Sequence, residues 1–209
     1  MILGRRVSLG FAVCVLGFIS VAAVPAQQVS PANAGQSDAI NVYAAFLNTY
    51  PGLGQGSRLL IADKTLTFVC GSEGDNGFSM GGCNGLRSND ESPSDRMAIV
   101  KRDLPELNAS TVLAFVSLNE HSVTIHERIP ALPTYYYFSD SDLPKGWKYT
   151  HLVYFSSVGF NPEHTQALLN VGIFSATDQR DSKGAYFILT KQSGKWVLGA
   201  SSAIWQMTP

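Results

Sequence analysis

The clearest pattern of hydrophobic and polar positions lies in the C-terminal part of the chain, over 151–209, where apolar runs are separated by short polar segments. Polar segments at 161–164 and 193–195 contain the Asn, Pro and Gly residues typical of hairpin turns. Because such turns reverse the chain direction, the pattern predicts an antiparallel meander. Its four apolar runs of strand length are 151–160, 165–174, 185–192 and 196–205.

A helical period precedes this region. The spacing i, i+3, i+4, i+7 of one buried helical stripe is shown by Ile40, Tyr43, Ala44 and Leu47. Ser37 is a suitable N-cap, and Pro51 with Gly52 would end the helix. The sequence therefore predicts a helix over 38–49.

The middle of the chain mixes both periods. Residues 104–119 fit a helical stripe and also alternate, and Asn108 as cap with Asn119 as stop favours a helix. Short β-type runs occupy 59–62, 66–69, 122–125 and 134–138, the first two forming either a hairpin or one irregular strand. We therefore expect an α+β fold, with an antiparallel sheet of about four to six strands packed with one or two helices.

The N-terminus has the layout of a secretory signal peptide. Arg5 and Arg6 precede an uncharged apolar stretch over 7–24, and Val24 and Ala26 are small residues at a cleavage site before Gln27. A retained membrane anchor is the alternative, because the apolar stretch is almost long enough to span a bilayer. We expect a signal peptide at 1–26 and a secreted or periplasmic protein.

The remaining chain fits one domain. Residues 27–36 form a flexible lead-in, and 37–209 have the length of a single α+β domain. Without 1–26 the chain holds 13 basic and 16 acidic residues, a net charge of −3. This balance argues against nucleic acid as a partner.

Two cysteines remain after signal cleavage. In an oxidising compartment, Cys70 and Cys83 are expected to form a disulfide that closes a loop worth about 3 kcal/mol. This pair lies at the start of a Gly-rich stretch over 70–95, which we interpret as a stapled surface loop.

The same loop contains a literal G-x-S-x-G match centred on Ser79. In hydrolases this motif exposes a serine nucleophile on a sharp turn between a buried strand and a helix. No apolar strand precedes Ser79 and no helical pattern follows it. A loop serine is therefore the preferred interpretation, and a serine hydrolase is the alternative.

Other chemical patterns are sparse. The four histidines show no metal-ligand spacing, and no phosphate-binding loop occurs, so we expect neither metal nor cofactor. Side chains alternate along the aromatic run 135–138, so one pair, Tyr135 and Tyr137, is a candidate ligand surface, with burial in the core as the alternative.

The segment FSSVGFNPEHTQALLNVG, followed by GAYFILTKQSGKWVLGASSAIW, resembles the C-terminal region of uncharacterised secreted proteins of Acidobacteria-type soil bacteria. Those proteins follow S-x-V-G-F-N, T-Q-A-L, G-x-Y-x-L and G-x-W, and the similarity covers about 105–205. Their connection after the T-Q-A-L strand often carries a cysteine pair, which 175–183 of this chain lacks. The resemblance implies a secreted domain and no particular activity.

Together these patterns predict a non-catalytic domain of the cell envelope that binds a protein or small-molecule partner. No membrane span is expected after signal cleavage. The competing hypothesis is the small secreted serine hydrolase that uses Ser79.

Overall fold

The computed structural model describes residues 31–68, 92–131, 133–139 and 148–207, and the side chains of 31–37 and 179 are left out. Three α-helices, one 3₁₀ helix and seven strands lie in these ranges. In chain order they are α1 (Pro31–Thr49), β1 (Arg58–Ala62), α2 (Pro93–Asp103), α3 (Ala109–Leu118), β2 (Thr134–Phe138), β3 (His151–Phe155), β4 (Gly159–Phe160), β5 (Gln166–Ser175), η1 (Gln179–Asp181), β6 (Lys183–Gln192) and β7 (Lys195–Gln206).

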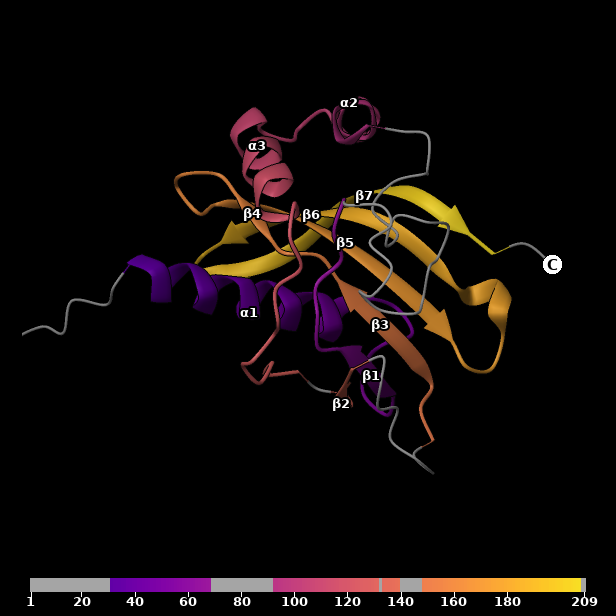
Figure 1. The fold of residues 1–209 in the computed structure, drawn as a ribbon. Coiled ribbons are helices and arrows are strands. Elements are labelled where there is room, and N and C mark those ends of the chain that lie inside the picture. Colours follow the sequence, from indigo (N-terminus) through magenta and orange to yellow (C-terminus); the bar gives the residue numbers. More distant parts are fainter. Residues whose placement is uncertain (1–30, 69–91, 132, 140–147, 208–209) are drawn as a thin grey trace, which may run out of the picture.

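The strands form one mixed sheet with the order β2-β1-β3-β5-β6-β7, and β4 pairs with β5 beside this path. β1 runs parallel to β2 and β3, whereas the pairs from β3 onward are antiparallel. α1 covers one face of the sheet, and α2 and α3 cover the other (Figure 1). The predicted α+β class is confirmed, with three helices and more strands than expected.

The predicted meander is confirmed, with one interruption. The run 151–160 is divided into β3 and β4 at Ser156. The backbone N of Ser156 still donates to Asn170 O at 3.0 Å, but Asn170 N donates to the Ser156 side chain, Oγ, at 2.9 Å. The turn between β6 and β7 consists of Ser193 and Gly194, both with positive φ (49° and 79°). Two such residues make the type I′ turn that suits the twist of a hairpin.

The face under α1 holds the larger core. The predicted stripe of α1 is confirmed, since Ile40, Tyr43, Ala44 and Leu47 are all buried. Phe46 belongs to the same core and packs against Phe155 and Phe187. α1 begins before the predicted start, so Ser37 lies within the helix and is not its N-cap.

The opposite face is covered by α2 and α3. α3 confirms the helix predicted over part of 104–119, with Asn108 and Asn119 as its end residues. α2 was not predicted, and the interpretation of 70–95 as a loop is wrong from Pro93 onward. Ser92 and Asp95 form a capping box, with Pro93 at the first helical position, and this start signal is visible in the sequence.

The region around β1 also differs from the prediction. β1 is not part of a hairpin, because its neighbours β2 and β3 run parallel to it and come from far along the chain. Leu66 makes only an isolated bridge with Ser156, and Thr124 only one with Lys64, so 66–69 and 122–125 do not form the predicted strands in the part that is described.

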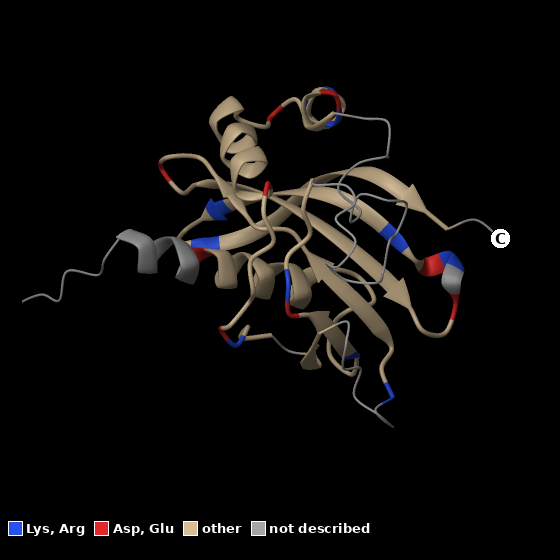
Figure 2. Ribbon diagram, viewed as in Figure 1, with Lys and Arg blue, Asp and Glu red and all other residues tan. Residues whose placement is uncertain are grey.

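Charged side chains of both signs are interspersed along the chain, many of them on turns and strand ends (Figure 2). In the described part of the chain, no helix combines the length and apolar character needed to cross a bilayer.

Candidate functional site

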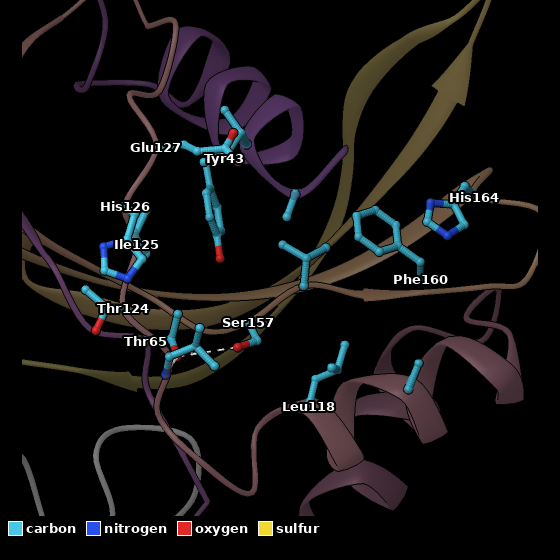
Figure 3. A pocket seen from close by; sticks show the side chains of 15 residues that line it. Tyr43, Thr65, Leu118, Thr124, Ile125, His126, Glu127, Ser157, Phe160 and His164 are labelled. Atoms are coloured by element: carbon cyan, nitrogen blue, oxygen red, sulfur yellow. Dashed lines mark hydrogen bonds between the residues drawn. The ribbon is translucent and has the colours of Figure 1, made fainter. Parts of the chain in front are cut away.

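A pocket of about 700 Å³ lies between α1, α3, the segment 123–127 and the chain around β4 (Figure 3). Most of its wall is apolar. These lining residues are Ala39, Ile40, Ala114, Leu118, Val123, Ile125, Val158 and Phe160. Leu118 and Val123 remain 49% and 54% exposed, which is unusual for large apolar side chains in a wall and marks the mouth of the pocket.

The inner wall on the α1 side is held by Tyr43. Its ring stacks on Phe155 with 4.6 Å between centroids, and its hydroxyl donates to Ser156 O at 2.9 Å. Burial raises the pKa of the Tyr43 phenol, because the phenolate would lose its hydration. The hydroxyl is therefore a neutral group already engaged inside the protein.

The wall over 123–127 is a connecting segment tied to the end of β1. Thr65 Oγ1 accepts from Val123 N at 2.9 Å, and Ile125 N donates to Asp63 O at 2.7 Å. Ser157 Oγ also reaches Thr65 Oγ1, at 3.4 Å. Like the Tyr43 hydroxyl, these lining polar groups are bonded within the protein and leave an apolar interior.

The α3 wall is positioned by two contacts with the sheet. A Cβ on Gly159 of β4 would lie 2.5 Å from the backbone N of Phe115, so only glycine allows this close approach. Gln166 Oε1 accepts from Asn108 N at 2.7 Å and from Thr111 Oγ1 at 3.1 Å, which holds the start of α3. These contacts place Ala114 and Leu118 at the pocket.

One end of the pocket carries a polar cluster. His164 Nδ1 lies 3.0 Å from Asp38 Oδ2, and Lys191 Nζ lies 3.2 Å from Asp38 Oδ1. Partial burial raises the pKa of Asp38, but the hydrogen bonds from His164 and Lys191 outweigh it and leave this pKa below its usual value. His164 also stacks on Phe160, with 4.7 Å between ring centroids.

A smaller cleft of about 330 Å³ adjoins this cluster and is lined by Asp38, Lys191 and Trp196, among others. Lys191 Nζ lies 5.2 Å from the centroid of the Trp196 ring, a cation–π distance. Asp38 and His164 therefore stand between the apolar pocket and a polar cleft.

The opposite end of the pocket is different. His126 and Glu127 lie there, and both side chains are exposed (Figure 3). His126 has no hydrogen-bond partner among the described residues. The two ends therefore differ: His164 is oriented by the Asp38 carboxylate, whereas His126 is not oriented by a hydrogen bond to any described residue.

The candidate tyrosines do not line this pocket. Tyr135 and Tyr137 are half-buried beside the α1 core, and their hydroxyls donate to Ile129 O and Glu127 O. The most exposed ring of this strand is that of Tyr136, at 53%. A ligand role for Tyr135 and Tyr137 stays a prediction, although their hydroxyls are already engaged.

Cys70, Cys83 and Ser79 lie outside the described residues, as do the proposed signal peptide and the segment before Pro31. The disulfide and the serine nucleophile therefore stay predictions. No group of three His, Cys, Asp or Glu side chains in the described ranges could hold a metal ion.

Comparisons of the chain with models of protein families, with curated proteins and with solved structures found no match.

The Asp38–His164 pair was not predicted from the sequence. Asp38 was interpreted only as part of a helix start, and His164 only as a turn residue and as one of four histidines without metal-ligand spacing. The two residues are 126 positions apart. No short motif could have joined them, because their contact depends on how α1 crosses the sheet.

Proposed function

We propose that this protein is a non-catalytic binding domain that acts in the periplasm or outside the cell and holds a small apolar molecule in the pocket between α1 and α3. The location rests on the signal-peptide pattern of the N-terminus. The binding role rests on the pocket, whose volume of about 700 Å³ falls in the range of small-molecule sites.

The apolar lining is the observation that carries this proposal. The hydroxyls of Tyr43 and Thr65 are bonded within the protein, so they do not favour water over an apolar guest. Removing the surface of an apolar molecule and of this wall from water supplies the driving force. A bound apolar molecule would also bury part of the exposed side chains of Leu118 and Val123.

The test is a titration with phenylnaphthylamine, an apolar dye whose fluorescence rises when it leaves water. We expect saturable binding, and a loss of at least tenfold in affinity in Ala114→Phe, because the added ring would occupy the pocket.

The matched control is Ala98→Phe, which adds the same ring to an exposed position of α2 and should leave dye binding unchanged. Dye binding that is absent, or that is the same in both variants, would contradict the proposal.

A further inference from the structure

His164 is a lining residue whose hydrogen-bonding state is set by a charged side chain. An ionised carboxylate only accepts hydrogen bonds, so in the neutral form of the His164 imidazole the hydrogen lies on Nδ1, which is 3.0 Å from Asp38 Oδ2. Nε2 then carries the lone pair. No partner of Nε2 is found among the described residues, and the side chain is 38% exposed.

The ring itself is held in place. It stacks on Phe160 with an interplanar angle of 7°, and His164 adopts a positive φ of 50° at the tight turn between β4 and β5. Asn161 stabilises this turn by accepting from Thr165 N and Gln166 N. The acceptor therefore has a defined position at the end of the pocket.

The one cation that contacts this cluster, among the described residues, is already paired with a carboxylate. Lys191 pairs with Asp38, and the nearby Glu163 accepts from Asn161 Nδ2 at 2.9 Å. Lys191 and Lys195 line the adjoining cleft, and no Lys or Arg is among the residues that line the apolar pocket. A ligand that meets this end from the pocket therefore encounters a hydrogen-bond acceptor beside an aromatic ring. A neutral donor group suits it better than a carboxylate or a phosphate does.

The geometry points to a ligand class: an apolar, ring-containing alcohol whose hydroxyl donates to His164 Nε2 while its rings lie against Phe160 and the apolar wall. This inference rests on the proposed function and specifies its ligand. The ring preference follows from the aromatic side chains of Tyr43 and Phe160, which favour stacked or edge-on ring contacts.

The experiment compares a naphthol, the corresponding methoxynaphthalene and naphthalene by equilibrium dialysis at neutral pH. One hydrogen bond of ordinary strength corresponds to roughly a fivefold to tenfold difference in affinity. We expect the naphthol to bind that much more tightly than the methoxynaphthalene, which has an oxygen but no donor.

His164→Phe keeps a ring on Phe160 and removes the acceptor, so the naphthol should fall to the affinity of the methoxynaphthalene while naphthalene still binds. His126→Phe removes the histidine at the opposite end of the pocket and should keep the preference for the naphthol over the methoxynaphthalene. His121→Phe, at an exposed position that does not line the pocket, is the control and should change none of the three affinities.

The outcomes separate the two proposals. Equal affinities of naphthol and methoxynaphthalene in the unaltered protein would overturn the alcohol inference and leave the pocket proposal intact, whether or not the variants fold. A naphthol preference that is lost in His126→Phe and kept in His164→Phe would also overturn it. Failure of all three compounds to bind would contradict the proposed function itself.

Discussion

The two faces of the sheet are covered in different ways. The α1 face is held by a continuous apolar core in which the ring of Phe155 contacts those of Tyr43 and Phe46. The α3 face has a smaller core, and α3 is fixed at particular points by Gly159 and by the amide of Gln166. The packing of α1 depends on the apolar area that it buries, whereas the position of α3 depends on a few precise contacts.

This difference explains where the pocket lies. α1 is secured by the apolar side chains of its buried stripe, so Asp38 near its N-terminal part is free to pair with His164 and Lys191. α3 approaches β4 most closely at Gly159 among the described glycines, and it leaves Leu118 largely exposed. The pocket opens where the two coverings meet.

Removal of a core ring on the α1 face should have the largest effect. Phe46→Ala is expected to lower the free energy of unfolding by about 3–5 kcal/mol, the usual cost of the cavity left by a buried phenylalanine. Chemical denaturation measures it. Leu113→Ala, on the exposed part of α3, is the control and should change stability by less than about 0.5 kcal/mol. Equal losses of stability in Phe46→Ala and Leu113→Ala would contradict the conclusion that buried apolar area secures α1.

A methyl group at the glycine contact tests the other face. Gly159→Ala would force α3 away from β4, because the new Cβ meets the Phe115 backbone, and we expect a loss of about 2–3 kcal/mol. Dye binding should weaken as well, since α3 supplies one wall. Gly54→Ala, where an added Cβ would meet nothing within 4 Å, serves as the control. Unchanged stability in Gly159→Ala would show that α3 can shift freely.

Loss of the Gln166 hydrogen bonds to the start of α3 should lower the free energy of unfolding by less than Gly159→Ala does. Gln166→Leu keeps the size of the side chain but leaves the buried Thr111 hydroxyl without its acceptor, so we expect a loss of about 1–2 kcal/mol in stability. Hydrogen exchange should rise at the start of α3 more than in α1. A uniform rise in exchange over both helices would mean that the amide does not act locally.

The smallest expected effect is the contribution of Asp38 to the pH dependence of folding stability. Its pKa is lower in the folded protein than in the unfolded chain, so its stabilisation is present above pH of about 4 and is lost as pH falls through the folded-state pKa. Because water reaches the cluster, we expect less than about 1 kcal/mol. Asp38→Asn should therefore reduce stability at pH 7 and converge with the unaltered protein in acid, as followed by thermal melts. A difference that grows in acid would contradict this sign.

Local patterns predicted the elements that depend on neighbouring residues. The α1 stripe and the hairpin around Ser193 and Gly194 were confirmed because a helical face and a tight turn are encoded within a few positions. α2 was missed although Ser92, Pro93 and Asp95 carry a capping signal, since the Gly-rich stretch before them suggested a loop that continued.

The parallel pairing of β1 with β2 and β3 needed the tertiary structure. Parallel strands require long crossovers, and here α2 and α3 lie between β1 and β2, so no short-range pattern records the partner. Burial on both faces also hid the alternation of β5, in which each of the ten residues is buried.

The sequence by itself determined the α+β class, the antiparallel C-terminal meander and the buried stripe of the first helix. Only the tertiary structure decided the candidate site. Its apolar wall comes from α1, α3 and 123–127, and its acceptor exists because Asp38 meets His164 across 126 positions. Hydrophobic period is a local property of the chain, whereas the orientation of an imidazole by a distant carboxylate depends on how the packed helices and strands bring them together.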